Sequence, residues 1–209
     1  MIKIYGIAVS RTARPMWALE ELGLPYQVET VDFRKGDHKK PEFLKLNPMG
    51  RIPALQDGDV FLTESLAITL YIAQRYGAGK LWPADEPSRA RVLQWSMWAA
   101  TELEPVAYAM LKELNKKPED QDAKVLNNAR ANMKPLLDYL EISLAGHPHL
   151  LGEAFTLADL QVAVVLDYAN PRSKFDLSPW PRVAAWHEAC HNRHAYQRLN
   201  ELRAAVAAI

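Results

Sequence analysis

The segment after the first short apolar run, residues 2–5, holds two hydroxyls, Ser10 and Thr12, just before a helical pattern begins. Such a hydroxyl can stabilise an anion together with the free amides and the dipole of a helix N-terminus. A cysteine-like thiol has a pKa near 8.5, and lowering it to about 6.5 requires roughly 2.7 kcal/mol of preferential thiolate stabilisation. Ser10 would donate a hydrogen bond without ionising. The simpler alternative is that Ser10 only caps the helix.

A second helix start, at Glu64 and Ser65, could bind charged groups. The free amides of a helix N-terminus bind carboxylates, and Glu64 could pair with a neighbouring ammonium group. The local alternative is that Ser65 caps the helix and that the helix dipole favours Glu64 in the first turn. A basic pair, His38 and Lys39, could meet a second carboxylate, and its alternative role is a solvated charge run among the other loop lysines.

The residues His187-Glu188-Ala189-Cys190-His191 match the His-Glu-x-x-His pattern of zinc metalloproteases. Two imidazoles four residues apart share one face of a helix and can bind zinc. A third ligand must come from elsewhere, and His194 and Glu201 are the candidates that follow. The glycine turn of the longer metalloprotease motif is missing. A zinc hydrolase is therefore the remote alternative, and the prediction is a helix with Cys190 packed inside and no metal site.

The elements that must position Ser10 and Glu64 form an α/β unit. Residues 2–5 alternate as a first strand, residues 12–22 predict a helix that ends at Gly23, and residues 27–33 form a second extended run. Asp57-Gly58 between two short apolar runs predicts a hairpin. A helix over residues 66–76 follows, so the predicted order is βαβ and then ββα.

The rest of the chain predicts helices only. Residues 79–87 are rich in Gly and Pro and predict a linker. Pro105 and Pro135 should kink two long helices or mark their ends, and Thr156-Leu157-Ala158-Asp159 is a capping box. The predicted domains are therefore residues 1–78, an α/β domain, and residues 88–209, an all-helical domain. Apolar residues spaced three and four apart form the clearest helical stripe: Leu126, Ala129, Met133, Leu136, Leu140 and Leu144.

Composition excludes several classes of protein. The 25 Lys+Arg residues balance the 25 Asp+Glu residues, so the broad positive charge of a nucleic-acid binder is missing. One cysteine cannot form an internal disulfide, which favours a reducing compartment, and the predicted location is the cytoplasm. No apolar run reaches 18 residues, and the first residues do not resemble a signal peptide. Neither a membrane nor a nucleic acid is an expected partner.

Four segments, in this order and at these spacings, resemble the cytosolic glutathione transferases over nearly the whole chain. The resemblance implies a thioredoxin-like N-terminal domain and an all-α C-terminal domain. The pattern is most similar to the serine-type classes (phi, theta and related bacterial enzymes). The segments are residues 5–14 with 19–26, Asn47-Pro48-Met49-Gly50-Arg51-Ile52-Pro53-Ala54-Leu55, Leu62-Thr63-Glu64-Ser65-Leu66-Ala67-Ile68, and the capping box.

The resemblance implies a role for each candidate residue in binding glutathione. Ser10 matches the catalytic serine, Thr12 is the reserve hydroxyl, and Tyr5 is a strand residue. Ile52-Pro53 matches a cis proline that leaves the backbone of Ile52 free to pair with the cysteinyl part of glutathione. The remaining glutathione-binding residues implied are Ser65 for the γ-glutamyl carboxylate, Glu64 for its ammonium, His38 and Lys39 for the glycyl carboxylate, and Arg51, where relatives often have glutamine.

A second substrate, a small hydrophobic electrophile, would lie against the helix over residues 88–111. A simpler explanation for a stripe of this kind is core packing. Met49 falls where phi-like relatives place a residue that inserts into a partner subunit, so a homodimer is expected. The residues predicted to share the substrate side of the helix are Trp98, Thr101, Glu102, Pro105 and Tyr108.

The predicted function is conjugation of glutathione, used as a co-substrate, with no tightly bound cofactor. The alternatives of the same fold are a glutathione-dependent peroxidase, isomerase or dehalogenase, and a non-catalytic binding protein. Isomerases of the zeta class carry a Ser-Ser-Cys run where this sequence has Ser10-Arg11-Thr12. Disulfide exchange is disfavoured because Cys190 is far from that turn in the sequence.

Overall fold

The computed structural model describes residues 1–169 and 175–207. It divides into two compact units, of which the first combines Met1–Trp82 with Asn192–Ile209 and the second spans Pro83–His191. Among the helices of the described residues, none is both long and apolar enough to cross a membrane. The α/β composition of the N-terminal part and the helical character of the rest confirm the predicted fold class.

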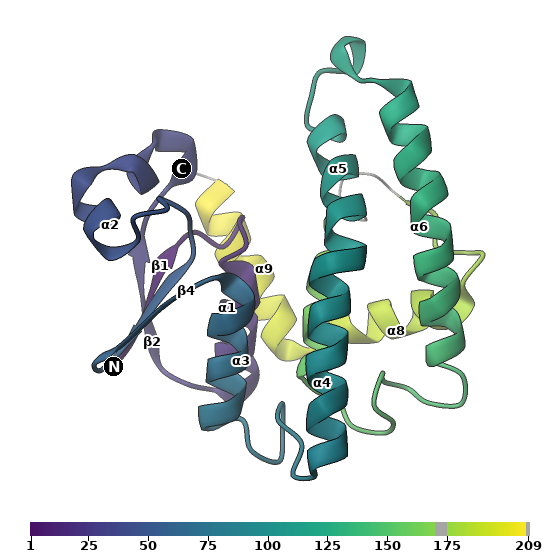
Figure 1. The fold of residues 1–209 in the computed structure, drawn as a ribbon, viewed down its shortest axis with the longest axis horizontal. Helices are drawn as coiled ribbons and strands as arrows, with labels where there is room; N and C mark the ends of the chain where they lie inside the picture. Colours follow the sequence, from purple (N-terminus) through teal and green to yellow (C-terminus); the bar gives the residue numbers. More distant parts are fainter. Residues whose placement is uncertain (170–174, 208–209) are drawn as a thin grey trace. The chain divides into compact units, whose positions relative to one another are not determined.

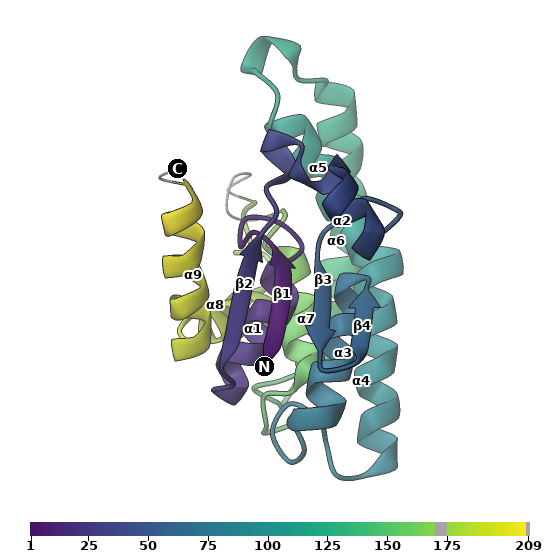
Figure 2. The same ribbon diagram turned by 90° about the vertical axis from the view of Figure 1, so that its left-hand side faces the viewer.

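A four-stranded sheet forms the centre of the first unit. Its strands are β1 (Ile2–Gly6), β2 (Tyr26–Thr30), β3 (Ala54–Asp57) and β4 (Val60–Thr63), in the order β2-β1-β3-β4. Strand β1 is parallel to β2 and antiparallel to β3, which pairs in turn with antiparallel β4 (Figure 2). The hairpin predicted at Asp57-Gly58 is the β3–β4 turn, where Gly58 has a φ of 59°.

Helices α1 (Ala13–Leu22) and α3 (Ser65–Tyr76) pack on the sheet and on each other (Figure 1). Their buried residues include Trp17 and Leu19 from α1 and Ile68 and Ile72 from α3. Gly23 ends α1 in the left-handed conformation, as predicted. Between β2 and β3 the chain forms two 3-10 turns and a short helix: η1 (Phe33–Lys35), η2 (Asp37–Lys39) and α2 (Pro41–Leu46).

The strand register brings four separate segments to one edge of the sheet. Tyr5 pairs with Ala54, and Ala54 pairs with Thr63, so the end of β1, the start of β3 and the end of β4 lie at the same edge. Gly6 pairs with Thr30 of parallel β2, whose end therefore joins them. The segments that hold Ser10, His38, Ile52 and Glu64 all leave from this edge.

The last helix, α9 (His194–Ala207), belongs to the first unit. It packs on α1, where the Trp17 and Tyr196 rings lie 4.7 Å apart. The Arg193 guanidinium also forms a bidentate pair with Glu21, at 2.7 and 2.8 Å. The structure thus differs from the predicted division, which placed residues 88–209 in one helical domain, because these long-range contacts fasten α9 to α1.

Within the described residues, the regular elements of the second unit are all helices, with one isolated β-bridge between His149 and Gly152. Helix α6 (Ala123–Ser143) continues through Pro135. The apolar stripe predicted for it is buried with one exception: Leu136 is half-buried, and the neighbouring Leu137 is buried instead. The capping box is confirmed at the start of α7 (Leu157–Leu166), a helix whose residues are all buried. The other helical elements are α4 (Glu86–Trp98), the π-helical η3 (Ala99–Leu103), α5 (Glu104–Leu114), the 3-10 turn η4 (Pro118–Asp120) and α8 (Pro181–His191).

Asp159, the third residue of α7, is a buried acceptor that joins three segments of the second unit. Its carboxylate accepts hydrogen bonds from the amides of Leu150 and Thr156 at 2.8 and 2.9 Å, and from the Trp186 indole at 3.0 Å. Because all these donors are buried with it, Asp159 does more than cap α7: it fastens the loop before α7 and helix α8 to the same point.

Candidate active site

Ser10 lies in the turn between β1 and α1, and its hydroxyl is held by three hydrogen bonds. The hydroxyl donates to the Ile7 carbonyl at 2.7 Å. It accepts from the Thr12 amide at 3.1 Å, and the Thr12 hydroxyl lies 2.8 Å away. Since the single proton of Ser10 is directed to Ile7, Thr12 is the donor between the two hydroxyls. Ser10 is half-buried, so the side chain is both oriented and reachable.

Thr12 is fully buried, at 0% exposure, and therefore cannot itself meet a ligand from solvent. Its side chain packs directly under Gly6, where an added Cβ would lie 2.2 Å from the Thr12 hydroxyl oxygen. Gly6 also has a φ of 147°, a conformation that L residues rarely adopt. Gly6 thus permits the close packing that places Thr12 against Ser10. Thr12 was expected to be a reserve hydroxyl, whereas in the structure it is buried and supports Ser10.

The first amides of α1 are engaged inside the same turn. The Ala13 amide donates to the Ser10 carbonyl at 3.0 Å and the Arg14 amide to the Arg11 carbonyl at 3.2 Å. The next residue, Pro15, has no amide proton. The helix dipole still favours an anion at this end, but these amides already have partners. The Ser10 hydroxyl is therefore the group in this turn whose proton can most readily be redirected.

Glu64 and Ser65 form the second part of the site. Glu64 is exposed and has a φ of 69°, in a region that costs a non-glycine residue of order 1–3 kcal/mol and that is often found at functional sites. Ser65 opens α3 and is buried. Its hydroxyl accepts a hydrogen bond from the Arg14 guanidinium at 3.0 Å, so its own proton remains the one it can donate.

Arg14 is a residue of the site that no sequence pattern indicated. It is only 2% exposed, and it joins the start of α1 to the start of α3 through Ser65. A buried guanidinium places a permanent positive charge beside Ser65. The available signal was a cation within the otherwise apolar face of α1, but its partner lies 51 residues away.

The basic loop between β2 and β3 supplies the third part. Lys39 is exposed, and its ammonium group lies 3.4 Å from the Met49 carbonyl. The neighbouring Lys40 forms an ion pair with Asp37, with a nitrogen–oxygen distance of 2.7 Å. The buried Nδ1 atom of His38 has no hydrogen-bond partner within the described residues. Arg51 is exposed, with its carbonyl held by the Asn47 side chain at 2.7 Å.

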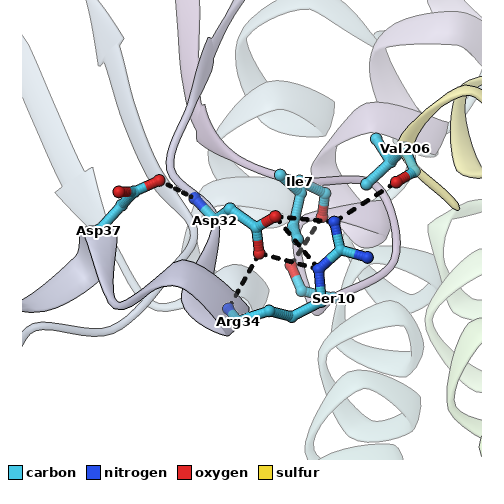
Figure 3. Close-up of polar contacts among 6 residues, drawn as sticks. All are labelled: Ile7, Ser10, Asp32, Arg34, Asp37 and Val206. Carbon is cyan, nitrogen blue, oxygen red and sulfur yellow. Dashed lines mark hydrogen bonds and ion pairs between the residues drawn. The ribbon is translucent and has the colours of Figure 1, made fainter. Parts of the chain in front are cut away.

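A bidentate ion pair fixes the start of this loop (Figure 3). The Arg34 guanidinium contacts both carboxylate oxygens of Asp32, at 2.7–3.1 Å, and donates to the Val206 carbonyl of α9 at 3.3 Å. The Asp32 amide donates to the Asp37 carboxylate at 3.0 Å. Hydrogen bonds from Arg34 hold the pKa of Asp32 at about 2. The loop that carries His38 and Lys39 is therefore tied at both Asp32 and Asp37.

Two further predicted features lie at the same sheet edge. The Ile52-Pro53 peptide bond is cis, as the resemblance implied. Ile52 packs against the cluster of Val31, Phe43 and Ala54. Tyr5 is a strand residue, as predicted, and its hydroxyl donates to Gln56 at 3.1 Å. The structure therefore brings Ser10, the 52–53 peptide, Glu64-Ser65 and the basic loop to one edge of one sheet.

The predicted stripe for the second substrate is divided in the structure. Trp98 packs against Trp95 and Tyr139, with ring centres 5.2 and 5.6 Å away, whereas the Tyr108 ring lies 6.4 Å from that of Tyr168. Trp98 therefore faces α6 and Tyr108 faces the end of α7. The physical reason is the π-helical segment at 99–103, which adds a residue to a turn and rotates the positions after it. Thr101, Glu102, Pro105 and Tyr108 are exposed.

Comparison with known proteins places these features in a family. Residues 1–74 match the family model described as glutathione S-transferase, N-terminal domain, and residues 103–194 match the corresponding C-terminal domain. Glutathione S-transferase 3 of Zea mays is 37% identical over 205 residues, which cover 94% of this chain and 92% of that protein.

Solved structures agree with these matches. Glutathione transferase F2 of Populus trichocarpa has a TM-score of 0.89 at 29% identity, covering 98% of this chain and 100% of that one. A glutathione S-transferase-I bound with lactoylglutathione has a TM-score of 0.86 at 31% identity, covering 96% and 99%. The similarity therefore extends over both units.

Proposed function

Because the chain belongs to the glutathione S-transferase family, we propose that it joins the sulfur of reduced glutathione to a hydrophobic electrophile. The observation that carries this proposal is the convergence of a polarised Ser10 hydroxyl, a helix start with Ser65 and a basic loop at one sheet edge. Glutathione presents a thiol between two carboxylates, and these groups match that arrangement. The enzyme is thus a glutathione transferase with glutathione as co-substrate.

The proposed chemical role of Ser10 is to stabilise the thiolate. The thiol loses its proton to solvent, and the Ser10 hydroxyl turns from the Ile7 carbonyl to donate to the sulfur. The Thr12 amide and hydroxyl continue to donate to the Ser10 oxygen, which strengthens Ser10 as a donor because successive hydrogen bonds polarise one another. The thiolate then attacks the electrophilic carbon in an oriented complex. The carbon–sulfur bond forms as a leaving group departs with its bonding electron pair, or as the π electrons of a multiple bond shift away and are protonated by solvent.

The proposed binding of the tripeptide follows the charges at the sheet edge. Ser65 donates to the γ-glutamyl carboxylate with the Arg14 guanidinium behind it, and Glu64 pairs with the neighbouring ammonium group. Lys39, His38 and Arg51 meet the glycyl carboxylate, and the Ile52 backbone pairs with the cysteinyl part. Lys39 is the strongest basic candidate, because Lys40 already pairs with Asp37.

We also propose that the enzyme is of the serine type and forms a homodimer. The hydroxyl at position 10 supports the first part. Met49 supports the second, since it is 63% exposed on a turn that Asn47 braces by bonds to the Met49 amide and the Arg51 carbonyl. A bacterial affiliation stays a prediction, because the relatives named above with their organisms come from Zea mays and Populus trichocarpa. The proposed cytoplasmic location rests on the single cysteine, Cys190, which is buried.

For the electrophile we propose a site that uses the exposed residues Thr101, Glu102, Pro105 and Tyr108. Trp98 contributes by packing rather than by contact, because it is engaged with Trp95 and Tyr139. A conjugation assay over aryl halides, enals, isothiocyanates and hydroperoxides would separate conjugation from peroxidase, isomerase and dehalogenase activities of the same fold.

Glutathione binding is tested by calorimetry on Glu64→Ala. Loss of one charge-assisted contact at an exposed position should raise the Kd about tenfold. Glu64→Gln, which keeps the side-chain length and one acceptor, is the matched control and should show a smaller increase. An unchanged Kd in Glu64→Ala would remove Glu64 from the site, and no binding by the wild-type chain would refute the proposed function.

A further inference from the structure

Helix α8 ends in a pair of histidines that the transferase reaction does not use. His187 and His191 are four residues apart, and this spacing places them on one face of the helix. Their ring centres are 4.0 Å apart. These are the two histidines of the His-Glu-x-x-His pattern noted in the sequence, and neither is at the sheet edge of the first unit.

The structure supplies a third group, Asp167, from a different helix. Asp167 directly follows α7, and its Oδ1 atom lies 3.1 Å from Nε2 of His187 and 2.8 Å from Nε2 of His191. The possible ligand atoms of all three residues lie within 4.8 Å of one another. The sequence candidates for a third ligand, His194 and Glu201, belong instead to the first unit.

These separations are close to those of a metal site. Ligands bound tetrahedrally at about 2.0–2.1 Å from zinc are about 3.3 Å from one another. The two observed nitrogen–oxygen distances, 3.1 and 2.8 Å, therefore need to open by only a few tenths of an ångström. Metal binding would replace the two nitrogen–oxygen contacts by nitrogen–metal bonds, with each neutral imidazole then carrying its proton on Nδ1.

Burial and charge also favour a cation. The side chains of Asp167 and His187 are each 4% exposed, whereas that of His191 is 31% exposed. The cluster therefore combines one carboxylate with two imidazoles in a largely buried place, and His191 is its most exposed member.

We propose that Asp167, His187 and His191 form a binding site for a divalent transition metal ion of the zinc type, with water in the fourth position. Two imidazoles and one carboxylate are a common zinc ligand set. The site joins the end of α7 to α8 and stabilises the second unit. We propose a structural role rather than a protease centre, because Glu188 is exposed while the two histidines face the buried Asp167 carboxylate.

The test is a titration of the chelator-treated full chain with Co²⁺, followed by displacement with Zn²⁺. Co²⁺ should produce the intense visible bands of a tetrahedral site at one ion per chain, and Zn²⁺ should remove them. Saturating Zn²⁺ should also raise Tm by several degrees, since it binds the folded state. His191→Gln, which changes the more exposed ligand, should weaken binding at least tenfold, and Asp167→Asn should do the same.

Two matched variants define the specificity. His147→Gln removes an exposed histidine outside the cluster, and Cys190→Ala removes the buried thiol on the same helix; both should bind Co²⁺ as the wild type does. Far-ultraviolet circular dichroism establishes that each variant is folded. Binding that persists unchanged in folded His191→Gln, binding that is lost in Cys190→Ala, or no Co²⁺ spectrum in the wild type would each overturn the proposal.

Discussion

The hydroxyl of Ser10 should account for about half of the thiolate stabilisation that the reaction requires. Replacing it in Ser10→Ala removes the donor and keeps the backbone bond from the Ala13 amide to the carbonyl of residue 10, while the Thr12 amide and hydroxyl lose their acceptor. We expect the kinetic pKa of the bound thiol to rise by about one unit in the variant, with glutathione affinity largely retained.

The magnitude follows from the bond that Ser10 already makes. A hydrogen bond to a charged group contributes about 1.5–3 kcal/mol, and a neutral one about 0.5–1.5 kcal/mol. Since Ser10 must give up its bond to the Ile7 carbonyl, the net gain is about 1–1.5 kcal/mol. At about 1.36 kcal/mol per pKa unit, this is roughly one unit of the two needed to reach a pKa of about 6.5. The dipole of α1 and nearby cations must supply the rest.

The assay is the pH dependence of kcat/KM for conjugation, measured on wild type, Ser10→Ala and Thr12→Val. A one-unit rise should lower the rate about fivefold at the wild-type pKa and hardly at all two units above it. Thr12→Val keeps the buried volume but removes the hydroxyl that donates to Ser10. The kinetic pKa of the bound thiol should therefore rise by less in Thr12→Val than in Ser10→Ala.

Three results would refute the reasoning. An unchanged kinetic pKa in Ser10→Ala would show that Ser10 gives no net stabilisation and that the thiolate depends on the helix terminus. A rise of two units or more would show that Ser10 supplies the whole effect, so that its bond to Ile7 costs nothing to break. A larger shift in Thr12→Val than in Ser10→Ala would make Thr12 the direct donor, despite its burial.

Three further changes test the dimer, the second unit and the basic loop. Met49→Asp places a charge on the proposed dimer contact and should weaken dimers in size-exclusion chromatography with light scattering; an unaltered dimer would discard that role. Asp159→Ala leaves three buried donors unpaired and should lower the free energy of unfolding by about 3 kcal/mol in urea, whereas a loss under about 1 kcal/mol would contradict its role. Asp32 has a pKa of about 2 in the folded protein, below its pKa of about 3.9 in the unfolded chain. Its ionised carboxylate therefore stabilises the folded state fully at pH values above the unfolded pKa, and this contribution disappears as the pH falls toward 2. Asp32→Asn should therefore have a lower urea midpoint at neutral pH that converges with the wild type in acid, and a constant difference would contradict this.

Local patterns in the sequence were sufficient for most elements of the fold. The alternation of residues 2–5, the Asp57-Gly58 hairpin, the helix stop at Gly23 and the capping box at Thr156 each depend on residues close together in the chain, and each is confirmed. The order βαβ and then ββα could be predicted for the same reason. The family itself could also be inferred from the sequence, since four weak motifs at fixed spacings are specific together.

Contacts between distant residues could not be predicted in this way. The partner of Arg14 is 51 residues away, and Asp167 lies 20 and 24 residues from the two histidines it meets. The substrate residues were predicted to share one side of a regular helix, and the π-helical segment before Pro105 rotates the later residues away from Trp98. The burial of Thr12 could not be predicted either, because exposure depends on what packs over a side chain. It makes Thr12 a hydrogen-bond partner of Ser10 and not a second donor to a ligand.

The sequence by itself determined the local elements and the chemical groups available: a hydroxyl before one helix, a serine opening another, a basic loop and two histidines one helical turn apart. Only the tertiary structure decided which of these groups meet, because strand register, and not distance along the chain, brings Ser10, Ile52 and Glu64 to one edge of the sheet. The same holds for α9, which long-range packing on α1 assigns to the first unit. Short-range geometry fixes dihedral angles and caps, whereas the pairing of remote side chains is fixed by how the elements pack.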